Sequence, residues 1–197
     1  MTNIKWVSAA LIMFSTVVCQ AQSKFEGVVK YNTTNTAVNE IATVAWYLKN
    51  GQSRLEFDTQ AGENHLTYSL MMDNQEKEAF LTTGGASQYV SGIKADEKIA
   101  QAKFIRKTKV TENGYECEML MFKSGDYELV YWMTNDVPIT YEQLPHLVKN
   151  NMPKLTGISN GFPVKMEIRD AVGTIVQSQD VVSVTPTKVD DSKFVRK

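Results

Sequence analysis

Residues with chemically useful side chains are few in this sequence and widely separated. Cys117 lies between Glu116 and Glu118, whose charges disfavour the thiolate that a reactive cysteine requires. The two histidines, His65 and His146, are far apart, whereas a zinc site usually draws its ligands from an organised spacing. No H-E-x-x-H motif occurs. We therefore expect no catalytic residue, no metal site and no cofactor, and we predict that the protein is not an enzyme.

Composition and charge narrow the class of partner. The 197 residues are 43% hydrophobic and 22% charged, which is typical of a globular domain. Lys and Arg number 21 against 22 Asp and Glu, whereas nucleic-acid binders generally carry a basic surplus that displaces phosphate counterions. We therefore expect no nucleic-acid partner. One basic cluster either solvates a strand or contacts an anionic surface or partner; it comprises Lys103, Arg106, Lys107 and Lys109.

The N-terminal segment is typical of a secretory signal peptide. Lys5 supplies a positive charge, and the mostly apolar residues 6–18 are too few to span a bilayer comfortably. Because Cys19 to Ala21 fits a small-x-small cleavage site, we predict that residues 1–21 are removed and that residues 22–197 form one secreted or periplasmic domain. The alternative is a lipid anchor on Cys19, although Val18 stands where a lipobox requires a small residue. No other apolar run is long enough to predict a membrane span in the mature chain.

Most of the remaining chain alternates apolar and polar residues between glycine-containing turns, a pattern typical of antiparallel strands. An amphipathic helix is predicted over residues 140–150, although Pro145 would cost it a hydrogen bond. Residues 84–100 and 151–162 are predicted to be loops. The predicted strands are 25–32, 40–49, 52–58, 64–73, 77–82, 103–111, 114–123, 126–134, 163–169 and 173–185.

The dipeptide Asn50-Gly51 predicts a two-residue type I′ hairpin turn. Such a turn places Trp46 opposite Leu55, and Val44 opposite Phe57. Leu48 falls on the same face by alternation. This face is therefore strongly apolar.

Two further turns set the registers of a second group of strands. A turn at Asn113-Gly114 places Val110 opposite Cys117, and a turn at Ser124-Gly125 places Cys117 near Trp132. These strands are apolar on both faces, so we expect helices, loops or a ligand to cover the second face. A curved antiparallel sheet around an apolar interior satisfies this requirement.

Several short segments of the chain have a distinctive sequence. They are Phe25-Glu26-Gly27-Val28-Val29-Lys30-Tyr31, Gly114-Tyr115-Glu116-Cys117, Tyr131-Trp132-Met133-Thr134, Asp136-Val137-Pro138 and Gly161-Phe162-Pro163-Val164-Lys165-Met166-Glu167. Together they resemble the domain-of-unknown-function 4412 (DUF4412) family of secreted bacterial envelope proteins, over most of residues 24–195. That family is similar to the lipoprotein-carrier fold of LolA and LolB. The resemblance implies a mainly β fold, with a strongly curved antiparallel sheet (open or half barrel) facing a small helical cover across a hydrophobic cavity.

These observations together predict a non-catalytic protein that binds a hydrophobic or lipid-like molecule on the concave face of the sheet. The alternative is an envelope protein-interaction or structural module with a filled core. The expected lining residues are Val44, Trp46, Leu48, Leu55 and Phe57, with Met121 and Trp132 as further members of the same interior.

Overall fold

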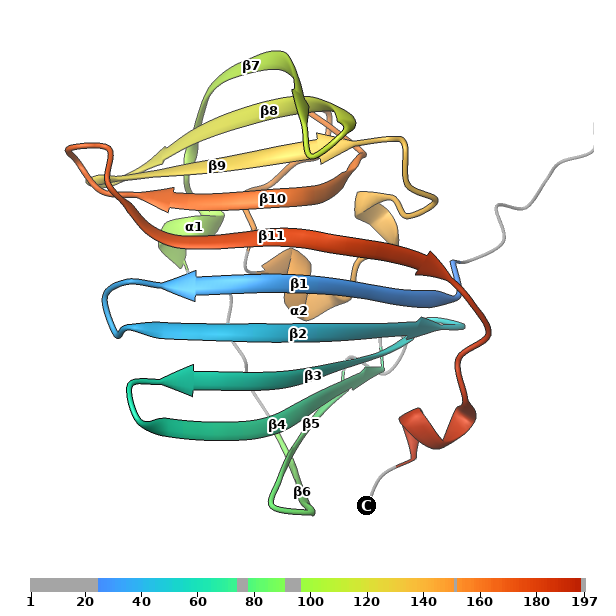
Figure 1. The fold of residues 1–197 in the computed structure, drawn as a ribbon. Helices are drawn as coiled ribbons and strands as arrows, with labels where there is room; N and C mark the ends of the chain where they lie inside the picture. Colours follow the sequence, from blue (N-terminus) through green and yellow to red (C-terminus); the bar gives the residue numbers. More distant parts are fainter. Residues whose placement is uncertain (1–24, 74–77, 91–96, 151, 196–197) are drawn as a thin grey trace, which may run out of the picture.

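The computed structural model describes residues 25–73, 78–90, 97–150 and 152–195, so the predicted signal peptide lies outside the described residues. One open antiparallel sheet dominates the fold, which confirms the predicted mainly β class (Figure 1). The strand order is β6-β5-β4-β3-β2-β1-β11-β10-β9-β8-β7. No helix within these described ranges is long and apolar enough to cross a bilayer.

The strands lie close to their predicted positions. One strand, β6, was not predicted, because Gly84-Gly85 was assigned to a loop. Both glycines have positive φ angles (58° and 84°), as a two-residue hairpin turn requires, and Thr83 pairs with Ala86 across it. The strands are β1 (Gly27–Asn35), β2 (Glu40–Lys49), β3 (Gln52–Ala61), β4 (Asn64–Asp73), β5 (Glu78–Thr83), β6 (Ala86–Tyr89), β7 (Lys103–Glu112), β8 (Tyr115–Ser124), β9 (Tyr127–Thr134), β10 (Phe162–Arg169) and β11 (Ile175–Pro186).

The helical cover is smaller than predicted and is broken in the middle. A 3-10 helix, η1 (Tyr141–Gln143), and a short helix, α2 (His146–Asn150), replace the single helix expected over residues 140–150. Leu144 between them has extended angles (φ −62°, ψ 143°), because the ring of Pro145 disfavours helical geometry in the residue before it. Another short helix, α1 (Glu97–Ala100), lies in the predicted loop 84–100.

The hairpin turns follow local sequence, with one correction. Asn50-Gly51 and Asn113-Gly114 all have positive φ angles, and the predicted pairs Trp46–Leu55 and Val110–Cys117 are confirmed. The turn between β8 and β9 lies one residue later than predicted, since Ser124 pairs with Tyr127. Cys117 is therefore opposite Thr134, whereas Trp132 is opposite Met119. This shift of two paired positions keeps every side chain on its predicted face.

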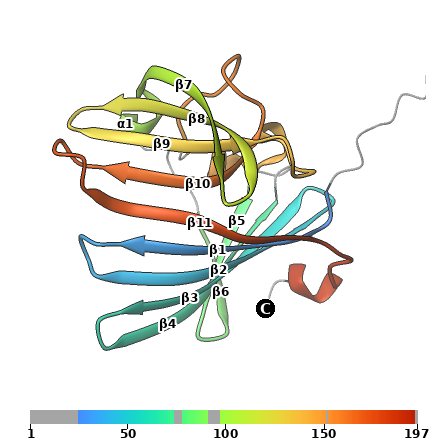
Figure 2. The ribbon, with the colours of Figure 1, turned by 45° about the horizontal axis from the view of Figure 1, so that its top comes forward.

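Both faces of the β8–β10 region are covered, as the two-sided apolar pattern predicts. On one face, here called the inner face, α1, α2 and the loop between β9 and β10 lie behind the sheet (Figure 1). On the opposite, outer face, the tip of the β7–β8 hairpin folds over the sheet (Figure 2). Its Glu112 hydrogen-bonds Lys165 of β10 at 2.9 Å. The core therefore extends through the sheet at this end and includes Leu120 and Tyr131 inside, and Val130 and Trp132 outside.

The first and last strands of the described chain pair with each other in the middle of the sheet. β11 pairs with β1 and so joins the two groups of consecutive strands. After β11, the chain ends in a 3-10 helix, η2 (Asp191–Phe194), that contacts β3. Lys49 holds this segment by an ion pair with Asp191 at 2.6 Å, and Lys193 bonds Glu56 at 2.9 Å.

Candidate functional site

The candidate site is a cavity of about 430 Å³ between the inner face of the sheet and the helical cover. We call it the central cavity. Most of its walls are aliphatic, aromatic or thioether side chains. Its lining comprises Tyr31, Thr33, Val44, Trp46, Leu55, Phe57, Leu70, Met72, Ile99, Tyr131, Val148, Met152, Pro163, Lys165, Met166, Ile168, Gln177 and Gln179.

Strand alternation places one wall of the central cavity. Because successive side chains of a strand point to opposite faces, Val44 and Trp46 of β2 point the same way. Their partners on β3, Phe57 and Leu55, lie directly opposite them and line the cavity as well. Leu70 extends this apolar wall on β4, where it pairs with Leu55.

The opposite wall comes from segments distant in sequence. Ile99 of α1, Val148 of α2 and Met152 approach the sheet from the helical cover. The side chains of the lining that end in an amide or an aliphatic hydroxyl lie where β1, β10 and β11 are neighbours. There Thr33 of β1 pairs with Gln179 of β11, and Gln179 pairs in turn with Met166 of β10. This end of the cavity is therefore the more polar, and Thr33 and Gln179 are half-buried there.

The seven side chains predicted from sequence are not all at the cavity. Val44, Trp46, Leu55 and Phe57 line it. Leu48 shares their face by strand alternation and is buried in the core, but it is not part of the cavity wall. Met121 and Trp132 lie on the outer face, so placing them in the same interior was wrong.

The reason for this error is visible in one row of paired residues. Across the sheet, Thr33 faces Gln179, Gln179 faces Met166, and Met166 faces Tyr131. Tyr131 is therefore the cavity-facing residue of β9, and its neighbour Trp132 must point outward. Trp132 instead packs under the ammonium of Lys165, which lies 4.9 Å from its ring centroid.

Other lining residues were missed because they belong to strands that meet only in the folded chain. Tyr131, Met166 and Ile168 had been assigned to predicted strands, but nothing local relates their faces to that of β2. The available clue was the second apolar face of the β8–β9 hairpin, which contains Tyr131. That face turns out to be the inner one.

The titratable groups around the cavity whose pKa values are shifted do not exchange protons near neutral pH, so they are unsuited to acid–base catalysis. Burial raises the pKa of the Tyr31 hydroxyl well above its ordinary value, and burial together with Tyr141 raises that of Tyr131. Burial alone would lower the pKa of Lys165, but hydrogen bonds and charges from Glu112 and Glu167 outweigh it, so the pKa is raised. Both hydroxyls and the ammonium therefore keep their protons near neutral pH.

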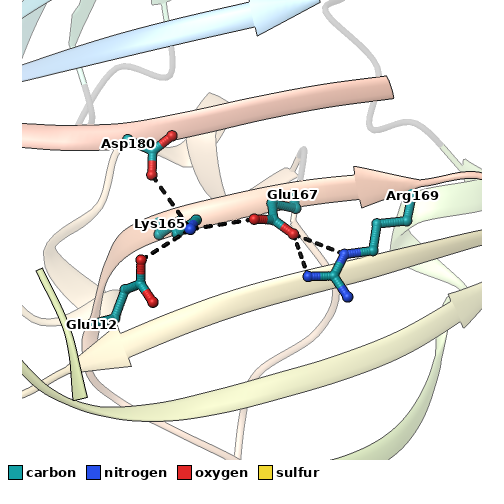
Figure 3. A network of polar contacts seen from close by, with 5 residues as sticks. All are labelled: Glu112, Lys165, Glu167, Arg169 and Asp180. Carbon is teal, nitrogen blue, oxygen red and sulfur yellow. Dashed lines mark hydrogen bonds and ion pairs between the residues drawn. The ribbon is translucent and has the colours of Figure 1, made fainter. Parts of the chain in front are cut away.

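Lys165 also borders the cavity, but its ammonium belongs to an ionic network (Figure 3). Its Nζ lies 2.9 Å from Glu112, 3.3 Å from Glu167 and 3.9 Å from Asp180. Glu167 in turn accepts two hydrogen bonds from Arg169. With its charge surrounded in this way, Lys165 serves as a structural tie between β10, β11 and the β7–β8 tip rather than as a free cation for a ligand.

One segment outside the cavity lining has the spacing of a hydrolase nucleophile motif, and the expectation of no catalytic residue had overlooked it. Gly157 to Gly161 forms G-x-S-x-G, but a nucleophile elbow joins a strand to a following helix. Here the segment follows a turn and leads into strand β10. Its Ser159 hydroxyl accepts a hydrogen bond from the Gly161 amide at 3.3 Å. The segment is therefore a loop that ends at β10, and it lacks the strand-to-helix geometry of a nucleophile elbow.

The contacts of Cys117 and His65 also favour structural roles over chemical ones. Cys117 is buried, and burial with the nearby acids raises its pKa to about 11, so the thiol is held protonated. His65 is exposed and pairs with Asp58 on the neighbouring strand. Within the described ranges, no cluster of three or more His, Cys, Asp or Glu side chains could hold a metal ion.

A second depression lies on the same inner face beyond the central cavity. We call this depression the outer hollow, although it lies on the inner face and not on the outer face. It has a volume of about 470 Å³ and is more open than the central cavity. It is built on β2 to β5 and combines apolar side chains with hydroxyl, amide and carboxylate groups. Its lining comprises Glu40, Thr59, Ala61, Asn64, Leu66, Tyr68, Leu81 and Thr83.

Several solved structures align with this chain at very low sequence identity. An uncharacterized conserved protein from Thermus thermophilus aligns with a TM-score of 0.55 at 9% identity, over 89% of this chain and 87% of that one. MucB aligns with a TM-score of 0.43 at 9% identity, over 90% of this chain and 60% of its own. The hypothetical protein CT021 from Chlamydia trachomatis gives 0.45 at 8%, over 86% and 91%. The first likeness shows a common fold.

Sequence comparison gives the family more directly. No curated protein shows significant similarity to the chain. A family model described as a domain of unknown function matches residues 25–196, which include every strand that the structure describes. This is the family whose motifs the sequence resembles. The chain belongs to the DUF4412 family.

Proposed function

We propose that the protein binds a hydrophobic, lipid-like molecule in the central cavity without catalysing a reaction on it. The observation that carries this proposal is the cavity itself, with its volume of about 430 Å³ and its largely apolar walls. Small-molecule sites typically enclose about 300–1,000 Å³, with mostly apolar walls and a few placed polar groups. The central cavity matches this description, because Thr33, Gln177 and Gln179 supply the polar groups at one end.

The binding energy comes from removing apolar surface from water. Each Å² of buried apolar area contributes roughly 25 cal/mol before the costs of association are subtracted. A non-catalytic role is supported by the chemistry of the walls. The polar groups at the β1–β11 end are amides and a hydroxyl, and Tyr31, Tyr131 and Lys165 keep their protons near neutral pH.

The compartment is part of the same proposal. Residues 1–21 have the pattern of a signal peptide, which supports action outside the cytoplasm, in a periplasm or secreted space. An apolar ligand there needs a protein to shelter it from water. The competing role, an envelope interaction module, requires a filled interior, and the central cavity favours ligand binding over that role.

The test combines ligand discovery with a matched pair of variants. Protein purified from a membrane-containing lysate is examined by native mass spectrometry and then extracted with organic solvent. Uptake of a fluorescent acyl probe with an uncharged head group is measured for the wild type, for Ile168→Trp and for Ile175→Trp. Ile168 lines the cavity, whereas Ile175 is exposed at the start of β11 and receives the same change in size.

We expect a lipid adduct near one per chain, and at least tenfold weaker probe binding by Ile168→Trp because the larger ring occupies the ligand's space. Ile175→Trp should bind within about twofold of the wild type. Circular dichroism confirms that both variants fold. Ligand-free protein that takes up no probe would refute the proposal and leave the interaction module as the better account.

A further inference from the structure

The central cavity and the outer hollow adjoin each other along the inner face, and we call the path through both of them the track. On β3 the successive inner-face residues are Leu55 and Phe57, which line the cavity, then Thr59 and Ala61, which line the hollow. No inner-face position separates the two sets. The same sequence of sites runs along β4, since Leu55 pairs with Leu70 of the cavity wall and Thr59 pairs with Leu66 of the hollow.

Two cross-strand pairs join the two sites: Leu70 of the cavity wall pairs with Leu81 of the hollow, and the other pair is aromatic. Phe57 of the cavity wall pairs across the strands with Tyr68 of the hollow. Their rings stack with centroids 4.5 Å apart and planes 9° from parallel. Because the two ring faces cover each other, the pair presents its ring edges to a hydrocarbon chain that passes from one site to the other.

The length of the track indicates what fits it. From Leu55 to Ala61, β3 advances roughly 20 Å at about 3.3 Å per residue. The hydrocarbon core of a bilayer is about 30 Å thick, so one acyl chain of a leaflet spans about 15 Å. The track therefore accommodates a full-length membrane acyl chain, with room at the outer end for a head group.

Charge indicates which end of the ligand lies where. The described residues that line the outer hollow include one charged side chain, Glu40, beside the neutral polar groups of Asn64 and Thr83. Leu66 within this lining is 50% exposed, so the hollow is in contact with water. A carboxylate head placed beside Glu40 would face a like charge, whereas a hydroxylated head could hydrogen-bond there.

We infer that the ligand is a single-chain lipid with a neutral hydroxylated head group. Its acyl chain lies in the central cavity and passes the Phe57–Tyr68 pair, and its head lies in the outer hollow. This inference rests on the proposed function and adds the length and head-group class of the ligand. It also defines the outer hollow as the part of the site that selects long chains over short ones.

The experiment measures binding of a homologous series of monoacylglycerols, from octanoyl to stearoyl, by displacement of the fluorescent probe. The wild type is compared with Leu66→Asn in the hollow and with Ile41→Asn. Ile41 is 60% exposed on β2 and points to the outer face, so it is the matched control. Because both positions are at least half exposed, neither change threatens folding.

Affinity in the wild type should rise about fourfold per added methylene through the long members, since each buried CH₂ contributes about 0.8 kcal/mol. Leu66→Asn should weaken stearoyl binding at least fivefold and leave octanoyl binding within twofold. Ile41→Asn should change neither. Free fatty acids of the same length should bind at least tenfold more weakly at neutral pH, because their carboxylate meets Glu40.

The possible failures are distinguishable. An affinity that stops rising at short chains, or equal effects of Leu66→Asn on short and long chains, overturns the extended site while short-chain binding still supports the proposed function. Equal binding of fatty acids and monoacylglycerols overturns the neutral head group. Failure of the wild type to bind any member of the series overturns the proposed function and this inference together.

Discussion

Replacement of Lys165 by Met should destabilise the fold strongly, because Lys165 joins three carboxylates from three strands. The lysine side chain is 21% exposed and that of Glu167 is 5% exposed, so both charges are largely removed from water. Glu167 keeps its Arg169 partner in the variant, but Glu112 and Asp180 lose the ammonium that balances them. Met preserves most of the aliphatic packing on Trp132, so the loss is electrostatic.

The size of the effect follows from these contacts. Breaking a buried ion pair by removing one partner costs about 3–5 kcal/mol, and the partial exposure of Glu112 and Asp180 reduces this. The lost contact between the ammonium and the Trp132 ring adds about 0.5–1 kcal/mol. We expect a loss of about 3 kcal/mol. For a domain of this size, that corresponds to a fall in Tm of about 6–12 °C.

The assay is thermal and urea unfolding monitored by circular dichroism, with Lys30→Met as the control. Lys30 is an exposed lysine on β1, so its replacement should change stability by less than about 0.5 kcal/mol. Adding Glu112→Gln to Lys165→Met should recover part of the loss, because one unbalanced carboxylate is removed. The pH dependence gives a second check. Since the pKa of Lys165 is raised in the folded protein, its contribution is complete below the unfolded pKa, near 10.4, and is lost as the pH rises through the folded value.

A loss in Lys165→Met no larger than that in Lys30→Met would refute this reasoning. Such a result would show that the attraction within the ionic network only offsets the free energy needed to remove its charges from water, as happens in some buried pairs. A loss that Glu112→Gln fails to reduce would instead assign the effect to packing against Trp132.

Three further predictions concern other parts of the fold. Burial raises the pKa of Asp180. A carboxyl group whose pKa is raised on folding stabilises the folded state at low pH, and this stabilisation is lost as the pH rises. Asp180→Asn should therefore raise Tm at pH 7 but not below about pH 4. Cys117, with a pKa of about 11, should resist a thiol reagent at pH 8 in a Cys19→Ser background and react fully in denaturant; rapid native reaction would contradict its burial. Gly161→Ala should lower stability by more than about 1 kcal/mol in urea unfolding, because the added Cβ would lie 2.7 Å from the Thr134 carbonyl oxygen; an unchanged midpoint would show that the backbone yields freely.

The part of the site on β2 and β3 could be predicted because it depends on local rules. A two-residue turn at Asn50-Gly51 determines which residues face each other, and alternation then determines their shared side. Val44, Trp46, Leu55 and Phe57 therefore line the cavity where local geometry puts them. The break at Pro145 has an equally local cause.

The rest of the site depends on contacts between distant segments. β11 lies between β1 and β10, and its pairing with each of them is interrupted by a shift in register. Each shift changes which residues share a face, so counting along the chain could not relate Trp132 to Trp46. The strands, most turns and the apolar face of β2–β3 were predictable because they follow from neighbouring residues. Strand order and bulges arise only when the first and last strands pair, and these place Tyr131 toward the cavity and Trp132 toward the ionic network.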